Sequence, residues 1–333
     1  AHGGYKLPDQ VEDQIQELLN TPWDRPTGAA VGEVEYDDDW AEKSYIEHLM
    51  TSLGTDLHGL RIAVDCANGG ASFLAPEAFR QAGADAVVIN AAPDGRNIND
   101  KAGSTHPEQL QALTVASEAD FGVAYDGDAD RCLAVDRDGN IVDGDKIMGA
   151  LAVHMRDEGQ LAKDTLVVTV MSNLGLILAM QEAGIKTIQT GVGDRYVLEA
   201  MLEGGYSLGG EQSGHIIAKK YATTGDGILS SLLLARMVKE SGRDLADLTS
   251  FIKRLPQTLI NVGGVDRSRA NTDPVVAEAV AAAEAVLGNT GRVLLRPSGT
   301  EPLVRVMVEA ATQAQADGVA SRLADVVKEN LAL

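Results

Sequence analysis

The stretch Phe121-Gly122-Val123-Ala124-Tyr125-Asp126-Gly127-Asp128-Ala129-Asp130-Arg131-Cys132-Leu133-Ala134-Val135 determines how we interpret this sequence. Its two apolar runs, residues 121–125 and 132–135, predict two buried strands. The loop between them carries three aspartates at alternate positions, separated by small residues that let the backbone curl. Three converging carboxylates suit a hard cation such as Mg²⁺. Arg131 adds a positive charge suited to a phosphoryl oxygen.

Three other structures could explain this acidic loop. A short Asp/Gly cluster usually forms a solvated turn, and this alternative stays open. A calcium loop of the EF-hand type is excluded, because its sixth and twelfth positions, normally Gly and Glu, hold Arg131 and Arg137. The hairpin signal Asp138-Gly139 follows the second strand, so it does not explain the acidic loop.

Composition limits the function classes. The 333 residues carry a formal net charge of −21 and no Lys/Arg-rich run. Binding to nucleic acid or to an anionic membrane surface is therefore disfavoured, since both need clustered cations. Cys66 and Cys132 lie in apolar runs and are expected to be buried thiols. The sequence shows no membrane-spanning stretch and no signal peptide, so we expect a cytoplasmic protein.

Strand and helix patterns divide the chain into four segments. Residues 1–55 have too little apolar pattern to fold alone, and they are expected to be the remnant of a first domain and a linker. Strand–helix alternation predicts an α/β domain over 56–145 and a second one over 146–255. Residues 256–333 predict a smaller α+β domain, because an Ala-rich helix, two strands and a final amphipathic helix follow one another there.

A second candidate site is the loop from Arg296 to Pro302. Its hydroxyl, backbone N–H and guanidinium groups suit a phosphate, and Pro, Ser and Gly equally suit a plain turn between strands. The groups in question come from Arg296, Ser298, Gly299, Thr300 and Arg305.

Two further Gly-rich loops follow predicted strands. In the first, Glu211 and Ser213 offer acceptors and donors matched to vicinal sugar hydroxyls, although a plain polar loop is the default for such a motif. His215 is either a ligand contact or a histidine packed under that loop. The other loop, residues 190–195, departs from the dinucleotide pattern because Tyr196 stands where the third glycine belongs. A nicotinamide site is therefore disfavoured.

With these loops in hand, the chain resembles the α-D-phosphohexomutase superfamily. The motifs are Asp126-Gly127-Asp128-Ala129-Asp130-Arg131, Gly210-Glu211-Gln212-Ser213-Gly214-His215 and Arg296-Pro297-Ser298-Gly299-Thr300-Glu301-Pro302, in the order of the superfamily. The resemblance covers almost the whole chain. It implies an α/β fold with two tandem phosphohexomutase-type domains and a small C-terminal α+β domain like the TATA-box-binding protein. It also implies a preceding domain with a phosphoserine loop of the type Ser-His-Asn-Pro.

By this resemblance, the whole enzyme is an isomerase. It exchanges phosphoryl groups between a phosphoserine and the 6- and 1-positions of a hexose, through a 1,6-bisphosphate. The cofactor is Mg²⁺, held by Asp126, Asp128 and Asp130, with Arg131 in support. The phosphosugar is bound by Gly193, Asp194, Arg195, Glu211, Ser213, His215, Arg296, Ser298, Gly299, Thr300 and Arg305. No catalytic serine is implied within this chain, so we expect it to be inactive alone.

Finer details favour the amino-sugar phosphate branch of the superfamily, which serves cell-wall precursor synthesis. They are Glu211-Gln212-Ser213 in the sugar loop and the runs Val192-Gly193-Asp194-Arg195-Tyr196-Val197, Asn97-Ile98-Asn99 and Gly103-Ser104-Thr105-His106-Pro107. Mutases of glucose or mannose phosphate are the alternative, as are a non-catalytic phosphosugar-binding protein and a purely structural fragment. The partner is a phosphosugar, and a homodimer is a further expectation.

Overall fold

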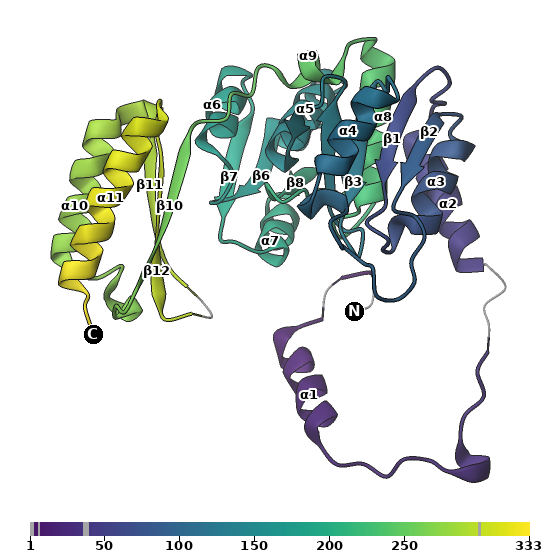
Figure 1. Cartoon of the computed structure of the whole chain (residues 1–333), viewed down its shortest axis with the longest axis horizontal. Helices are drawn as coiled ribbons and strands as arrows, with labels where there is room; N and C mark the ends of the chain where they lie inside the picture. The colour runs from purple at the N-terminus through teal and green to yellow at the C-terminus, as the bar shows by residue number, and fades with distance from the viewer. Residues whose placement is uncertain (1–2, 6, 36–39, 299–300) are drawn as a thin grey trace. The chain divides into compact units, whose positions relative to one another are not determined.

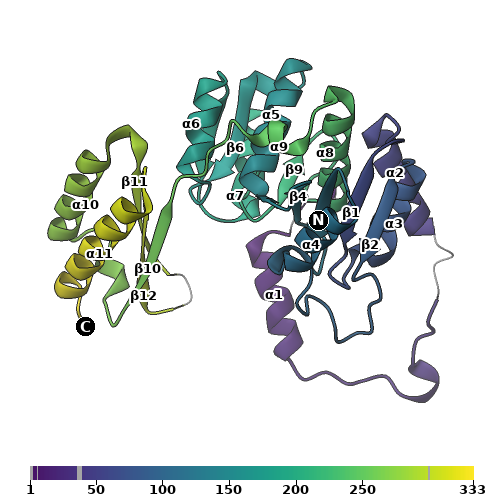
Figure 2. The same cartoon turned by 45° about the horizontal axis from the view of Figure 1, so that its top comes forward.

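The computed structural model describes residues 3–5, 7–35, 40–298 and 301–333. The chain divides into two compact units. The first unit is Ala1–Met171 with Ala183–Phe251, and the second is Ser172–Glu182 with Ile252–Leu333. We describe each unit by itself (Figures 1 and 2).

The first unit contains a five-stranded sheet in the order β2-β1-β3-β4-β5. Its strands are β1 (Arg61–Asp65), β2 (Asp85–Ile89), β3 (Phe121–Tyr125), β4 (Cys132–Asp136) and β5 (Ile141–Val142). β1 is parallel to β2 and β3, whereas β4 is antiparallel to β3 and β5. The change of direction follows from the short connection, because the six residues between β3 and β4 are too few for a crossover to a parallel strand. These six residues are the acidic loop.

A four-stranded sheet of the same unit, in the order β7-β6-β8-β9, has the same arrangement of parallel strands followed by an antiparallel neighbour. Its strands are β6 (Thr165–Thr169), β7 (Lys186–Thr190), β8 (Leu208–Gly210) and β9 (Ile216–Ala218). β6 is parallel to β7 and β8, and β9 returns antiparallel to β8. The predicted sugar loop therefore also connects a strand of the parallel part to an antiparallel neighbour. β5 and β9 were not predicted from the sequence, because two or three residues carry no periodic signal.

The helices of the first unit follow the chain order that the strand–helix pattern predicted, and all but the exposed α1 accompany its two sheets. They are α1 (Asp9–Asn20), α2 (Trp40–Leu53), α3 (Ala71–Gln81), α4 (Glu108–Ala116), α5 (Gly144–Asp157), α7 (Asp194–Gly204), α8 (Gly227–Ser241) and α9 (Leu245–Thr249), with short 3-10 turns at Gly28–Ala30, Gly103–Thr105 and Ala162–Asp164. Aspartates begin two of them, since Asp143 accepts the N–H of Lys146 and Asp226 accepts that of Leu229.

The second unit is a three-stranded antiparallel sheet in the order β10-β12-β11. Its elements are α6 (Leu174–Glu182), β10 (Gln257–Gly263), 3-10 turns at Arg267–Arg269 and Gly288–Thr290, α10 (Pro274–Leu287), β11 (Arg292–Pro297), β12 (Leu303–Glu309) and α11 (Gln313–Asn330). α10 and α11 lie side by side over one face of this sheet (Figure 1). The apolar stripe of α11 and the sheet form one continuous core. This is the α+β unit that the sequence predicted.

A buried carboxylate ties α6 to the sheet of the second unit. Glu309 is fully buried, and its oxygens accept from Arg292 Nε at 2.6 Å, from Asn173 Nδ2 at 3.0 Å and from the N–H of Leu174 at 3.0 Å. A charge this deeply buried is tolerated because each oxygen is paired. Among the described residues, no helix combines the length and the apolar character that a membrane crossing requires.

Candidate active site

The acidic loop gathers its three carboxylates in space. Asp126 follows β3 directly and is 5% exposed, Asp128 is exposed, and Asp130 is half-buried. One oxygen of each lies within 4.8 Å of the others. β3, buried along its whole length, fixes where this cluster stands, because its side chains cannot shift without opening the core.

The cluster carries more negative charge than its own cations neutralise. Burial, and next the negative charge of Asp130, raise the pKa of Asp126 from 3.8 to about 6. Arg131 is the cation beside the cluster, with its Nε 3.6 Å from Asp126 and 3.7 Å from Asp130. Oδ1 of Asp130 is buried and has no hydrogen-bond partner within the described structure. Crowded carboxylates with an oxygen that accepts no hydrogen bond suit a bound cation.

The predicted sugar loop connects β8 to β9 and is closed by two backbone hydrogen bonds, from Glu211 N to His215 O at 2.9 Å and from Gly214 N to Glu211 O at 3.0 Å. The Glu211 carboxylate accepts the N–H of Gly193 at 3.1 Å, so the Gly-rich loop after β7 is tied to it. Ser213 lies exposed at its tip. The structure thus brings Glu211, Ser213 and Gly193 to one place.

The acidic loop and the sugar loop are joined. The N–H of Cys132 donates to the carbonyl of Gly214 at 3.1 Å, and Nδ1 of His215 lies 2.9 Å from Oδ2 of Asp130. Gly214 has φ +96°, and a Cβ there would stand 2.2 Å from the Cys132 carbonyl oxygen, so only glycine fits this approach. The two predicted sites are therefore one continuous structure within the first unit.

His215 is a packed histidine rather than an exposed one. It is 3% exposed, and its Nε2 accepts the N–H of Gly225 at 3.0 Å. Asp194 Oδ2 lies 3.5 Å from the same nitrogen. Arg195 pairs with Glu199 at 3.0 Å on the first turns of α7. Asp194 and Arg195 thus stand beside the loop that carries Gly193.

The predicted phosphate loop lies in the second unit. Arg296 of β11 and Arg305 of β12 are directly opposite each other in the antiparallel register. Nε of Arg305 is buried without a hydrogen-bond partner within the described structure. The N–H of Ser298 donates to the carbonyl of Leu303 at 2.9 Å, which closes the loop. Gly299 and Thr300, two of the predicted phosphate contacts, lie outside the described residues.

Two contributors to these loops escaped the sequence analysis. Arg267 donates through Nη1 to the carbonyl of Ser298 at 2.5 Å and to that of Glu301 at 3.2 Å. Asp145 accepts from Gln212 Nε2 at 2.9 Å and so holds the sugar loop against α5. Each lies at least 31 residues from its partner in the sequence, and neither belongs to a motif that would single it out.

Loops of this composition at the turns of two such sheets define a sugar-phosphate enzyme, and comparison with known families agrees. The chain belongs to the phosphoglucomutase/phosphomannomutase family of phosphohexomutases. It matches alpha/beta/alpha domain II over residues 43–139, alpha/beta/alpha domain III over 143–255 and the C-terminal domain over 259–326.

The full-length relatives at high identity are phosphoglucosamine mutases. That of Bifidobacterium longum subsp. infantis is 60% identical over all of this chain and 74% of its own length. That of Kineococcus radiotolerans is 58% identical over all of this chain and 75% of its own length. The resemblance to phosphohexomutases inferred from the three motifs is thereby confirmed.

Solved structures support the fold. A phosphoglucomutase/phosphomannomutase family protein of Burkholderia thailandensis superposes with a TM-score of 0.75 at 23% identity, over 97% of this chain and 71% of that protein. The N-acetylphosphoglucosamine mutase of Aspergillus fumigatus, solved in complex with GlcNAc-6P and magnesium, gives 0.72 at 23% identity, over 86% of this chain and 66% of that protein.

Proposed function

We propose that this chain supplies the metal-binding and substrate-binding parts of a phosphoglucosamine mutase, the isomerase that interconverts glucosamine 6-phosphate and glucosamine 1-phosphate. The observation that carries the proposal is the junction of the acidic loop and the sugar loop through Asp130 and His215. The 60% identity to phosphoglucosamine mutases over the whole chain supports glucosamine over glucose or mannose.

Mg²⁺ fits the acidic loop. Asp126, Asp128 and Asp130 would hold it, because three close carboxylates, among them Oδ1 of Asp130, which accepts no hydrogen bond from the described residues, are oxygen ligands of the kind this ion prefers. When bound, it would neutralise charge on the transferring phosphoryl group. The magnesium complex of the Aspergillus relative supports the choice of ion.

The protein's own groups bind and orient the sugar phosphate. The carboxylate of Glu211, held by the N–H of Gly193, accepts sugar hydroxyls, and Ser213 at the exposed tip offers a hydroxyl. Arg131 stands beside the acidic loop, where a phosphoryl oxygen would meet it. Such a site accelerates phosphoryl transfer by positioning and charge neutralisation.

The phosphate that does not react would be held in the second unit. Arg296 and Arg305 are directly opposite each other on adjacent strands, and a phosphate between them would reduce the repulsion of the two charges. Nη2 of Arg305 is paired with Oε2 of Glu301 at 3.3 Å, whereas its Nε has no hydrogen-bond partner among the described residues. Arg296, Arg305 and Ser298 form the described part of this phosphate site, and Gly299 and Thr300 remain predicted members. The four-segment division of the chain, a homodimer and a cytoplasmic location also remain predictions.

Equilibrium binding tests the proposal. The chain with Mg²⁺ is titrated with glucosamine 6-phosphate, glucose 6-phosphate and mannose 6-phosphate. We expect glucosamine 6-phosphate to bind most tightly, and Glu211→Gln to weaken it by at least ~10-fold through loss of a charged acceptor. Glu203→Gln, on α7, is the matched control. Tighter binding of glucose or mannose phosphate would reassign the substrate, and no binding of any phosphosugar would contradict the proposal.

A further inference from the structure

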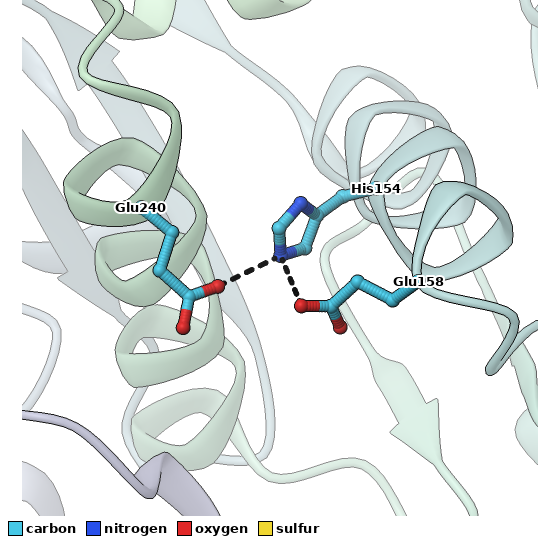
Figure 3. A group of neighbouring side chains, drawn as sticks. All are labelled: His154, Glu158 and Glu240. Atoms are coloured by element: carbon cyan, nitrogen blue, oxygen red, sulfur yellow. Dashed lines mark ion pairs between the residues drawn. The ribbon is translucent and has the colours of Figure 1, made fainter.

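A second group of possible metal ligands lies outside the acidic loop. His154 lies in the last turn of α5, and Glu158, four residues later, is the C-cap of that helix, so the two side chains lie on the same side of its end. Glu240 faces them from α8. Figure 3 shows the imidazole ring of His154 pointing between the two carboxylates. Both helices belong to the first unit.

One candidate ligand atom from each of the three side chains lies within 4.8 Å of the other two. Nε2 of His154 lies 3.4 Å from Oε2 of Glu240 and 3.7 Å from Oε1 of Glu158. A tetrahedral ion with bonds of about 2.0–2.1 Å holds its ligand atoms about 3.3–3.4 Å apart. Nε2 is itself buried and makes no hydrogen bond with the described residues. A neutral imidazole protonated on Nδ1 would aim a lone pair at two carboxylates, and a cation bound between them would remove that repulsion.

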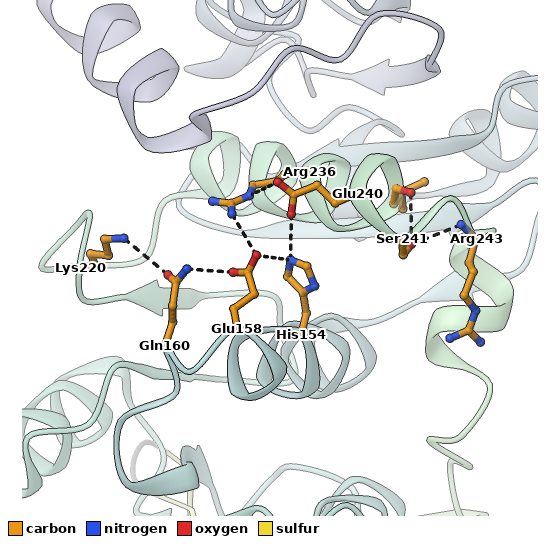
Figure 4. Close-up of polar contacts among 9 residues, drawn as sticks. His154, Glu158, Gln160, Lys220, Arg236, Glu240, Ser241 and Arg243 are labelled. Atoms are coloured by element: carbon orange, nitrogen blue, oxygen red, sulfur yellow. Dashed lines mark hydrogen bonds and ion pairs between the residues drawn. The ribbon is translucent and has the colours of Figure 1, made fainter.

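The other oxygens of both carboxylates are held by neighbours (Figure 4). Oε1 of Glu240 accepts from Arg236 Nε at 2.8 Å, and Oε2 of Glu158 accepts from Gln160 Nε2 at 2.9 Å. Arg236 Nη2 also reaches Oε1 of Glu158 at 3.1 Å. Outer partners of this kind fix the orientation of metal ligands. Arg236 offsets one of the two carboxylate charges, so one negative charge remains with the imidazole.

The cluster is accessible and has room for a further ligand. The side chains of His154, Glu158 and Glu240 are 22%, 28% and 33% exposed. A cavity of about 30 Å³ lies beside His154 and Glu158, and Arg236 also lines it. That volume is sufficient for a water molecule, which would complete a tetrahedron.

We propose that His154, Glu158 and Glu240 bind a divalent transition-metal cation, Zn²⁺ foremost. One imidazole with two carboxylates is a zinc-type ligand set, whereas Mg²⁺ prefers oxygen ligands alone. The ion would join the C-terminal turns of α5 and α8.

The N-terminal ends of the same helices hold the two loops of the candidate active site. Gly144 N donates to the carbonyl of Gln212 at 3.1 Å, and Gly227 N to that of Ala129 at 2.9 Å. The ion is therefore a structural link between the elements that support both loops. The competing interpretation has no metal: His154 carries a proton on Nε2, as the neutral tautomer or as the imidazolium, and points that N–H between the two carboxylates.

Calorimetry on the metal-stripped 333-residue chain tests the proposal. ZnCl₂ is titrated in excess MgCl₂, in wild type and in Asp128→Asn, so that the acidic loop does not contribute. We expect one Zn²⁺ per chain in both proteins. His154→Gln and Glu158→Gln should each weaken Zn²⁺ binding by more than ~10-fold, because loss of a ligand should cost at least as much as loss of a residue that only orients a ligand. His58→Gln, an exposed histidine, is the matched control.

Cobalt gives a readout that needs no variant of the cluster. Co²⁺ added to the Asp128→Asn protein should develop the strong visible absorption of four-coordinate Co²⁺ and lose it when Zn²⁺ is added. An unchanged weak spectrum would overturn the proposal, as would equal Zn²⁺ affinity in wild type and folded His154→Gln. A pH-dependent melting temperature without Zn²⁺ binding would assign the cluster to a proton instead and would also overturn it.

Discussion

Nδ1 of His215 donates a hydrogen bond to the carboxylate of Asp130. The assignment follows from the other ring nitrogen, since Nε2 accepts the N–H of Gly225 at 3.0 Å and is therefore unprotonated. Nδ1 then carries the proton toward Oδ2 of Asp130, 2.9 Å away. The sugar loop thus orients one carboxylate of the acidic loop and leaves Oδ1 of Asp130 for a metal ion.

Replacing His215 should therefore affect the metal more than the sugar. His215→Ala removes the partner of Asp130 and leaves the N–H of Gly225 unpaired. We expect Mg²⁺ affinity to fall by about 10–100-fold and the free energy of unfolding to fall by about 1–3 kcal/mol. Titration calorimetry and urea unfolding measure the two effects. His58→Ala is the control, and an unchanged Mg²⁺ affinity in the folded variant would refute the coupling.

The raised pKa of Asp126 predicts how Mg²⁺ binding depends on pH. Burial and the charge of Asp130 raise this pKa from 3.8 to about 6 in the metal-free chain. A protonated carboxyl does not ligate Mg²⁺, so affinity should decrease as the pH falls through 6. Calorimetric titrations at pH 5 and pH 8 measure this. Equal affinities at the two pH values would contradict the prediction.

The same raised pKa of Asp126 predicts that the stability of the metal-free chain decreases as the pH rises, whereas its Mg²⁺ affinity increases. Because the pKa of Asp126 is higher in the folded than in the unfolded chain, the folded state binds more protons between about pH 4 and 6. Asp126 therefore favours folding below that interval, and the advantage is lost as pH rises through 6. Asp126→Asn should stabilise the metal-free chain at pH 8 by about 1–3 kcal/mol. Asp138→Asn, on an exposed turn, should have no such effect in the same urea titrations.

If a phosphate binds between Arg296 and Arg305 in the second unit, its binding should depend on the planar guanidinium group and not only on the positive charge. Arg296→Lys keeps the charge but replaces a bidentate fork with a point charge, so phosphosugar affinity should fall by about 10-fold or more. Arg322→Lys, exposed on α11, is the matched control. A ligand-bound crystal with the phosphate at Arg195 instead would show that the assignment is wrong.

The sequence was sufficient for the strands and for the composition of the loops, because burial leaves a periodic apolar signal. Residues 121–125 form β3 as predicted, and 292–295 lie within β11. The sequence also predicts a strand from Tyr206 to Gly209, and this strand overlaps β8 at two residues only, since β8 begins at Leu208. Short elements depend on pairing rather than on pattern, and their bounds are correspondingly hard to predict.

Contacts between distant loops left no such signal. The bond between His215 and Asp130 joins residues 85 apart, and both alternatives for His215 were equally consistent with its neighbours in sequence. Arg267 supports the phosphate loop through backbone carbonyls, which any sequence offers. Only the folded geometry distinguishes such residues from ordinary surface arginines and histidines.

The 333-residue chain is expected to fold but not to turn over. The resemblance to phosphohexomutases implies a phosphoserine donor in a loop of the type Ser-His-Asn-Pro, and no such run occurs in this sequence. A coupled assay for glucosamine 1-phosphate, primed with glucosamine 1,6-bisphosphate, measures turnover. We expect no rate above background, although glucosamine 6-phosphate should still bind.

Ser104 is the residue that could defeat this expectation. It lies half-buried in the 3-10 turn Gly103–Thr105, two residues before His106. A Cβ at Gly103 would stand 2.3 Å from the carbonyl oxygen of Tyr125, so this turn packs closely against the end of β3, where the acidic loop begins. Robust turnover that Ser104→Ala abolishes and Ser117→Ala preserves would identify Ser104 as the phosphoryl carrier. Without that result, we expect the chain to bind a phosphosugar without turning it over.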